Sequence, residues 1–291
     1  MTRRNTILVT GATGTVGRPL VARLAADSNL RVRALVRDPA KAGELAGAEL
    51  ARGDFSDAQS LVAAMDGIDT LVLITASNAN AATQSHAAIA AAQQAGVRKI
   101  VRLSAIKADP NGPTDNTRQH GRTEAEIRAT GLTHVFLRPS AFMQNILWSA
   151  RQVLGEGRIY QGYGAAKVGL IDTRDVVDAL AAAATRDDFD GQTLELTGPR
   201  SVGQDDVATT LAGALGRDVN YVPVAPEQVG EALRGMGADE WTVQLVIDYS
   251  RAYASGWGDN VTDAVQRMTG HPARDLDAFV REVFVPATRG S

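Results

Sequence analysis

The sequence contains no cysteine and few aromatic residues. None of its 291 residues is cysteine, and only 5% are Phe, Trp or Tyr. The absence of cysteine excludes disulfides, thiolate metal sites, iron-sulfur clusters and a cysteine nucleophile. The four histidines never have the spacing of two ligands on one helix face; they are His86, His120, His134 and His271. We therefore expect no metal site.

Long hydrophobic runs and an excess of basic charge are also missing. No apolar stretch approaches the roughly 18 to 20 residues that a membrane helix needs, and the run at 6–10 is too short for the core of a signal peptide. The 30 Lys and Arg are nearly balanced by 33 Asp and Glu, so no positive field attracts phosphate backbones. We expect a cytoplasmic protein that binds neither nucleic acid nor membrane, as a monomer or homodimer.

Short apolar runs alternate with Ala-rich helical stretches over the first half of the chain. The alternation, with strands that are apolar on both faces, predicts an α/β fold with a doubly wound parallel sheet. Gly96 and Gly131 follow helical patterns that start near Ala81 and Thr117, where left-handed C-cap residues are expected. The predicted strands are 6–10, 31–36, a third just before Asp54, 69–75, 99–103 and 133–139. The helical stretches include 19–27, 40–46, 85–96 and 123–131.

The segment LVTGATGTVGRPL follows the first predicted strand and opens the first predicted helix. Gly11 allows a tight turn, Gly14 lets backbone N–H groups approach a pyrophosphate, and Gly17 lets the helix pack against the sheet. This context favours a dinucleotide site over a glycine-rich turn without a ligand. The cofactor-binding residues expected in the loop are Gly11, Thr13, Gly14, Thr15 and Val16.

Arg37 follows the second predicted strand, where an NAD-binding protein usually has Asp or Glu. A guanidinium there suits a 2'-phosphate, so we expect NADP, with NADPH preferred over NADH, and Lys41 could add to the preference. Alternatively, Arg37 is a solvated arginine paired with Asp38. Further along, Asp54 and Phe55 are placed to meet the adenine, although an N-cap role for Ser56 or Asp57 is equally compatible with this cluster.

The pattern changes after residue 139. A Gly-rich segment at about 155–169 precedes a further strand-and-helix unit at 168–185 and a strand in 192–199, and the chain is mostly helical beyond that point. We assign 1–142, completed by about 168–198, to an NAD(P)-binding domain. A smaller, mostly helical substrate-binding lobe comprises 143–167 and 199–291.

The helix after the fifth strand lacks the Tyr-x-x-x-Lys pair that short-chain dehydrogenases commonly use. Tyr163 and Lys167 match the spacing formally, but Gly162 and Gly164 flank the tyrosine and make a helix that presents both groups unlikely. We interpret this match as chance.

Several motifs in order resemble the NmrA-like branch of atypical short-chain dehydrogenases across nearly the whole chain: VTGATGTVG, LVRDPAK, GDFSD, LRPSAFMQN, IDTRDVVDA, ELTGP and MTGHPARDLDAFV. That branch includes type 2 quinone oxidoreductases, triphenylmethane dye reductases, isoflavone-type reductases and cofactor-sensing regulators. The resemblance implies a Rossmann fold with a small C-terminal lobe and NADP bound between the two. It does not imply one substrate.

In that branch the carboxyl ends of the fourth to sixth strands border the nicotinamide, in agreement with the rule for ligands of parallel sheets. Two residues near these ends are candidates for catalysis. Ser104 could hydrogen-bond the nicotinamide or a substrate oxygen, or could cap a turn. His120 corresponds to a functional lysine of the isoflavone-type reductases and could protonate a reduced carbonyl, or it is a surface histidine. The cofactor-binding residues expected at these ends are Thr75, Ala76, Ser77 and Pro139.

The segment RPSAFMQNILW offers residues for a flat substrate. Phe142, Asn145 and Trp148 are the candidate substrate-binding residues, although Phe142 could equally belong to the core. Trp241, Trp257 and Tyr249 could line or simply fill the smaller lobe, and His134 is expected to be a strand residue with a satisfied ring.

Together these features predict an NADPH-dependent reductase that passes hydride to a quinone, enone or other conjugated or aromatic small molecule. The alternative is a non-catalytic NAD(P)-binding sensor that acts through a protein partner. An epimerase or dehydratase of nucleotide sugars fits least, because that chemistry depends on the absent tyrosine.

Overall fold

The computed structural model describes residues 5–43, 45 and 47–289. Seven strands form one sheet in the order β3-β2-β1-β4-β5-β6-β8, and β7 pairs with β9 in a small second sheet. The register of each pair from β3 to β6 is parallel. The strands are β1 Asn5–Val9, β2 Leu30–Val36, β3 Glu49–Arg52, β4 Thr70–Leu73, β5 Lys99–Leu103, β6 Thr133–Pro139, β7 Arg158–Gln161, β8 Thr193–Leu196 and β9 Asn220–Pro223.

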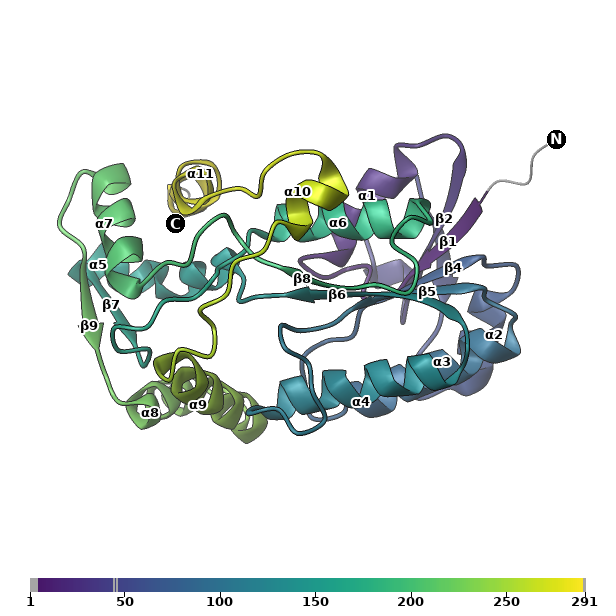
Figure 1. Cartoon of the computed structure of the whole chain (residues 1–291), viewed down its shortest axis with the longest axis horizontal. Coiled ribbons are helices and arrows are strands. Elements are labelled where there is room, and N and C mark those ends of the chain that lie inside the picture. Colours follow the sequence, from purple (N-terminus) through teal and green to yellow (C-terminus); the bar gives the residue numbers. More distant parts are fainter. Residues whose placement is uncertain (1–4, 44, 46, 290–291) are drawn as a thin grey trace. The chain divides into compact units, whose positions relative to one another are not determined.

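Helices cover both faces of the large sheet. Helices α2, α3 and α4 lie on one face, and α1 and α6 lie on the other (Figure 1), which confirms the doubly wound prediction. The larger helices are α1 Gly17–Ala25, α2 Ala58–Met65, α3 Ala81–Gln94, α4 Asp115–Ala129, α5 Ala150–Glu156, α6 Thr173–Thr185, α7 Gln204–Leu215, α8 Pro226–Gly235 and α9 Glu240–Ala254. The short ones are η1 Pro39–Lys41, η2 Met143–Ser149, α10 Ala264–Thr269, α11 Leu276–Phe279, η3 Val280–Phe284 and α12 Val285–Thr288.

The chain divides into two compact units. The first comprises the residues up to Gly112, Thr117–Arg138 and Val176–Leu194, and the second comprises Pro113–Asn116, Pro139–Asp175 and the residues from Glu195 onward. Each unit has its own core. Leu8, Leu71 and Phe136 are fully buried in the first, and Phe279 and Phe284 are fully buried in the second.

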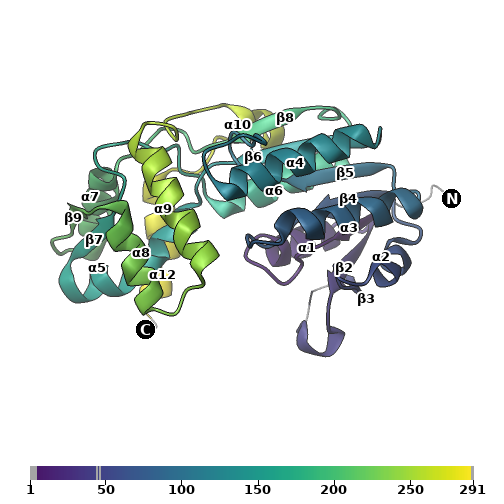
Figure 2. The same ribbon diagram turned by 90° about the horizontal axis from the view of Figure 1, so that it is seen from below.

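The second unit is built largely from helices around the β7–β9 pair, and α8 packs along α9 (Figure 2). This agrees with the expected helical C-terminal portion. The assignment of the two units to cofactor and substrate stays a prediction.

Helices α3 and α4 end close to the glycines that the sequence predicts as C-cap residues. Helix α3 begins at Ala81, and Gly96 has a positive φ of 72° two residues after its last residue. Gly131 likewise has a φ of 72° just beyond α4. Glycine has no Cβ and therefore adopts this left-handed conformation without strain, which lets the chain leave the helix sharply.

Two local predictions were wrong. The expected helix at 40–46 is only the 3-10 turn η1, because Gly43 turns to a φ of 65° directly afterwards; Glu44 and Ala46 lie outside the described residues. The expected strand at the start of 168–185 forms only isolated bridges. Val168 pairs with Val202 and Ile171 pairs with Phe142, so no continuous ladder develops. Strands β7 and β9 were not predicted.

Candidate functional site

The glycine loop joins β1 to α1 in a conformation that only glycine allows at two positions. Gly11 has a φ of 60°, and a Cβ on Gly17 would lie 2.1 Å from the carbonyl oxygen of Gly11. The Gly14 N–H donates to that same oxygen at 3.0 Å and closes the turn. Thr13, Gly14 and Thr15 are exposed on the loop, and Val16 is buried beneath it.

Thr10 fixes this loop to the end of β4. Its hydroxyl donates to the Ile74 carbonyl at 2.7 Å and accepts from the Ile74 N–H at 2.8 Å. Since β1 lies between β2 and β4, the loop sits at the point where the strand order reverses. Ligands of open parallel sheets bind at the carboxyl edge of this point.

The loop and α1 fit a pyrophosphate. The first turn of α1 contains no acidic residue, and Val16 makes no side-chain cap. The positive end of the helix dipole is therefore not neutralised by the chain itself. A Cβ at Gly17 would force the loop apart, so the close packing of loop and helix depends on this glycine.

Arg37 is exposed at the end of β2, and its guanidinium forms no ion pair with a described residue. The alternative pairing with Asp38 is not observed, because the Asp38 carboxylate lies 3.5 Å from Lys41 Nζ and accepts from the Ala40 N–H. Lys41 is 86% exposed. The charge of Arg37 acts instead on Asp54.

The Asp54 carboxylate accepts hydrogen bonds from the N–H and hydroxyl of Ser56, at 2.9 and 2.7 Å. These bonds, with a smaller contribution from Arg37, hold the pKa of Asp54 below its usual value. Asp57, not Ser56, is the N-cap of α2. Phe55 is half-buried against the core of the first unit. Both Asp54 and Phe55 remain candidates for the adenine end of the cofactor.

Beyond β4, Thr75 is half-buried, whereas Ala76 and Ser77 are exposed. The Thr75 hydroxyl accepts a hydrogen bond of 2.9 Å from Nη2 of Arg102. Arg102 lies on β5 and is 1% exposed, and its Nη1 donates to the Leu73 carbonyl at 3.2 Å. Burial lowers the pKa of Arg102 to about 10, and the negative charge of Glu124 opposes part of this shift.

His120 lies on α4 next to Arg102. Its Nδ1 is 3.2 Å from Nη2 of Arg102. Burial, together with the charges of Arg102 and Arg138, holds the pKa of His120 well below its usual value. The ring is therefore neutral near pH 7, and an imidazolium that gives up a proton is not the form present. The expectation that His120 protonates a reduced carbonyl, and its place in the site, stay predictions.

Ser104, just beyond the end of β5, belongs to a buried network that the sequence did not reveal. Its hydroxyl donates to Oε1 of Glu124 at 2.6 Å, and Glu124 is fully buried on α4. Arg138 binds the same carboxylate with two nitrogens, at 2.9 and 2.6 Å. Because the Ser104 proton is committed to Glu124, its oxygen can accept a hydrogen bond from a ligand but cannot donate one.

The segment with the predicted substrate residues belongs to the second unit. Pro139 is buried at the end of β6, Phe142 is half-buried, and Asn145 is exposed on η2. Trp148 is 74% exposed. Gln144 fixes the start of η2, because its amide donates to the buried Asp172 at 3.0 Å and accepts from the Thr173 N–H at 3.0 Å.

The aromatic residues of the second unit mostly pack against one another. The rings of Tyr249 and Tyr253 stack at 5.4 Å, and Trp257 lies 5.9 Å from Tyr253. Trp241 donates to Asp115 at 2.9 Å. Tyr163 packs edge-on against Tyr253, outside any helix.

Lys167 is exposed and also lies outside any helix, so this pair does not form the helical Tyr-x-x-x-Lys arrangement. His134 stacks on Phe136 and is hydrogen-bonded to the Leu132 carbonyl, which confirms the prediction of a satisfied strand histidine.

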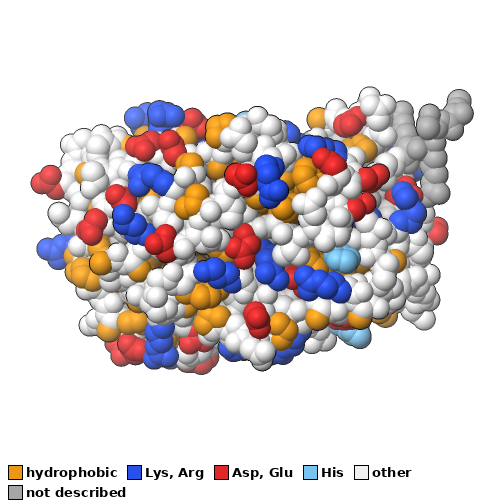
Figure 3. Space-filling view, in the orientation of Figure 1, with side chains coloured by type: hydrophobic (Ala, Val, Ile, Leu, Met, Phe, Trp, Pro, Cys, Tyr) orange, Lys and Arg blue, Asp and Glu red, His pale blue; other side chains and the backbone are white. Residues whose placement is uncertain are grey.

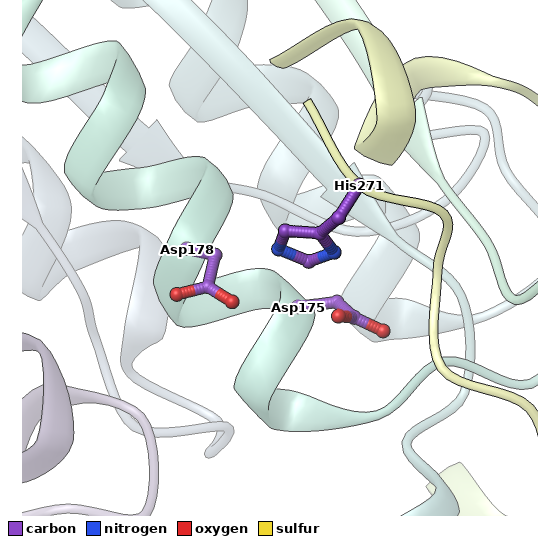
Figure 4. A group of neighbouring side chains, drawn as sticks. All are labelled: Asp175, Asp178 and His271. Carbon is purple, nitrogen blue, oxygen red and sulfur yellow. The ribbon is translucent and has the colours of Figure 1, made fainter. Parts of the chain in front are cut away.

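A cluster of side chains with metal-ligand chemistry does occur: Figure 4 shows Asp175 and Asp178 on α6 together with His271. Both carboxylates already have cationic partners. Asp175 is paired with Arg274, and Asp178 lies 3.1 Å from Arg23. Arginine thus supplies the positive charge that a metal ion would bring.

The described residues include no helix long and apolar enough to cross a membrane. On the face shown in Figure 3, acidic and basic side chains are interspersed.

Comparisons with known proteins agree with this geometry. A family described as NAD(P)H-binding matches residues 11–187. An NAD(P)H azoreductase from Xenophilus azovorans is 34% identical over 277 residues, which cover 94% of this chain and 96% of the relative. The structure of the Escherichia coli NADPH-dependent quinone oxidoreductase in complex with NADPH matches with a TM-score of 0.88 at 27% identity, covering 96% of this chain and 99% of that one.

The triphenylmethane reductase of Citrobacter matches with a TM-score of 0.87 at 25% identity, covering 96% of this chain and 99% of that one. The chain belongs to the NAD(P)H-binding family, with the NmrA-like fold of the atypical short-chain dehydrogenases. It is an NAD(P)H-dependent oxidoreductase that lacks a helical Tyr-x-x-x-Lys pair.

Sequence reasoning missed Arg102, Glu124 and Arg138. A signal was present, because Arg102 and Arg138 each follow an apolar run within a predicted strand, in KIVRL and THVFLRP. A charge in a strand covered on both faces needs a buried partner. Nothing in the spacing, however, identified Glu124 as that partner.

Proposed function

We propose that this oxidoreductase uses NADPH to reduce a flat, conjugated acceptor such as a quinone, enone or azo compound. The observation that carries the proposal is the 34% identity to an azoreductase over 94% of the chain. The names of the quinone oxidoreductase and the triphenylmethane reductase describe acceptors of the same electronic kind. All three acceptors are electron-poor conjugated systems that take up a hydride.

When bound, the reduced nicotinamide supplies the hydride, and the chain binds and orients the reactants. The glycine loop and the first turn of α1 would hold the pyrophosphate. Ser104, whose proton is held by Glu124, would accept a hydrogen bond from the carboxamide of the nicotinamide. Thr75, Ala76, Ser77 and Pro139 are proposed to border the nicotinamide ring, and Phe142, Asn145 and Trp148 are proposed to bind the acceptor.

The missing tyrosine is compatible with this chemistry. An electron-poor acceptor delocalises the charge that the hydride brings, so a strong proton donor is not required. A hydrogen bond to the developing negative charge is sufficient, and a neutral imidazole N–H can provide it.

The preference for NADPH over NADH rests on Arg37. Its exposed guanidinium has no ion-pair partner among the described residues and is available for a 2'-phosphate. Lys41 adds positive charge nearby, although Asp38 offsets part of it. We assign the first unit to the cofactor and the second to the acceptor, and we expect a cytoplasmic monomer or homodimer.

The test is the rate of NADPH oxidation by the purified protein with a panel of acceptors. The panel contains a quinone, an enone, an azo dye and a triphenylmethane dye, with a saturated ketone as the matched control. We expect oxidation with at least one conjugated acceptor and none with the saturated ketone. Binding of NADPH without turnover of any acceptor would refute the proposal and favour a sensor.

A further inference from the structure

Arg102 joins a predicted cofactor residue to a predicted catalytic residue. A single nitrogen, Nη2, donates to the Thr75 hydroxyl at 2.9 Å and lies 3.2 Å from Nδ1 of His120. The side chain of Arg102 is almost completely buried, and its Nε has no hydrogen-bond partner. A buried arginine with an unsatisfied N–H is costly, which argues that its two remaining nitrogens have a specific role.

The contact determines the tautomer of His120. An arginine has N–H donors and no acceptor, so Nδ1 of His120 must be the acceptor and carries no proton. A neutral imidazole has one N–H, and here that proton must be on Nε2. No described residue accepts a hydrogen bond from Nε2.

We propose that Arg102 is a positioning residue that holds His120 as the neutral Nε2–H tautomer, so that His120 donates a hydrogen bond to the acceptor during reduction. The role in reduction rests on the proposed function, whereas the tautomer does not. His120 differs in this from a general acid, because it keeps its proton throughout the reaction.

The charges around His120 support this form. Arg102 approaches from β5, Arg138 lies on β6, and Glu124 is one turn further along α4. Glu124 is bound by Arg138, so its charge is already compensated. Two nearby guanidinium groups disfavour a third positive charge on the ring.

The proton balance of the step is simple. A hydride brings one hydrogen with two electrons to the acceptor, so a neutral acceptor such as a quinone or enone becomes an anion. His120 hydrogen-bonds that anion through Nε2–H. The anion then takes one proton from water, which leaves hydroxide, and the two electrons of the reduction come from NADPH, which is oxidised to NADP+.

The tautomer can be tested without cofactor or substrate by nitrogen NMR of the imidazole rings. The chain has only four histidines, and H120Q identifies the signals of His120 by their loss. We expect an unprotonated Nδ1, a protonated Nε2 and no titration of His120 near neutral pH. A doubly protonated ring near neutrality, or a proton on Nδ1, would overturn the inference.

Two substitutions test the part played by Arg102. R102M is expected to raise the His120 pKa toward its usual range and to let the second tautomer appear, whereas R102K keeps the charge and should shift the pKa less. The matched control is R33M, which removes another largely buried arginine, from β2, and should leave the His120 signals unchanged. If R102M and R102K both leave the tautomer and pKa of His120 as in the wild type, Arg102 has no positioning role.

Kinetics test the role of Nε2–H with a neutral acceptor, such as a quinone or enone, that the protein reduces. We expect H120L to lower kcat by about tenfold to a hundredfold with little change in the NADPH KM, and H120Q to recover part of the loss, because its amide N–H donates without titrating. The wild-type kcat should not change with pH near neutrality through His120, and R102M should introduce an inflection there. Wild-type kcat in H120L would overturn the catalytic role, even if NMR confirms the tautomer.

Discussion

Replacing Arg37 by glutamate reverses the charge at the end of β2 where the 2'-phosphate is proposed to bind. The side chain is exposed and free of ion pairs with described residues, and Asp38 is engaged by Lys41. The substitution therefore breaks no internal contact that holds the fold. Its effect should fall mainly on the cofactor, apart from the loss of the favourable charge of Arg37 near Asp54.

The expected loss follows from one charge-assisted hydrogen bond, which contributes about 1.5 to 3 kcal/mol, or a factor of roughly ten to a hundred in Kd. Because Arg37 is exposed, solvent and salt screen the interaction, and we expect the lower part of this range at physiological ionic strength. Carboxylate at this position can instead accept from the ribose 2'-hydroxyl of NADH. R37E should thus bind NADPH about tenfold more weakly, and NADH as well as or better than the wild type.

Isothermal titration calorimetry with each cofactor, at low and at physiological salt, measures this directly. The matched control is R31E, an exposed arginine near the opposite end of β2, which should change NADPH affinity by no more than about twofold. Unchanged affinities for both cofactors in R37E would remove Arg37 from the site and refute the reasoning on NADPH preference.

Two further predictions concern stability. E124Q removes a fully buried carboxylate and leaves the half-buried Arg138 without its partner, and should lower the free energy of unfolding by about 3 to 5 kcal/mol in urea. E126Q, two residues along α4, breaks only a contact with the exposed His86 and should cost less than about 1 kcal/mol. Equal losses would contradict the role of the Glu124 network. Burial raises the pKa of Tyr163 from 10.0 to about 12, so the unfolded chain loses this proton first and stability must fall as pH rises above 10. Relative to Y163F, the free energy of unfolding of the wild type should fall by about 1.4 kcal/mol per pH unit from pH 10 toward 12. A difference between the two proteins that does not change with pH would show that Tyr163 has the same pKa in the folded and unfolded states.

The sequence predicted the large sheet well because its signals are local. Apolar strands such as KIVRL and DTLVLIT alternate with helices that end at Gly96 and Gly131, and each of these features is encoded within a few residues. The glycine loop was predictable for the same reason, because its glycines lie within a few residues of one another. The structure explains why one of them is needed, since a Cβ at Gly17 has no room. Strands β7 and β9 were missed because they pair across about sixty residues of sequence and carry no strong apolar alternation.

The chemistry at the strand ends was only partly predictable. Spacing placed Ser104 and His120 near the expected edge of the sheet, but their hydrogen-bonding roles depend on partners elsewhere in the chain. Ser104 is left as an acceptor because its hydroxyl donates to Glu124. His120 is neutral because burial, together with the charges of Arg102 and Arg138, lowers its pKa. Such roles follow from three-dimensional contacts between charged groups, which no single motif encodes.

The most direct measurement of the central claim is deuterium transfer from NADPH labelled at C4 of the nicotinamide. The acceptor is the enone or triphenylmethane dye of the panel, because each takes the hydride at carbon and retains the label. Hydride transfer predicts one deuterium per molecule of reduced product from one of the two labelled faces. Reduced product without deuterium from either face, or bound NADPH with no reduced product at all, would contradict it.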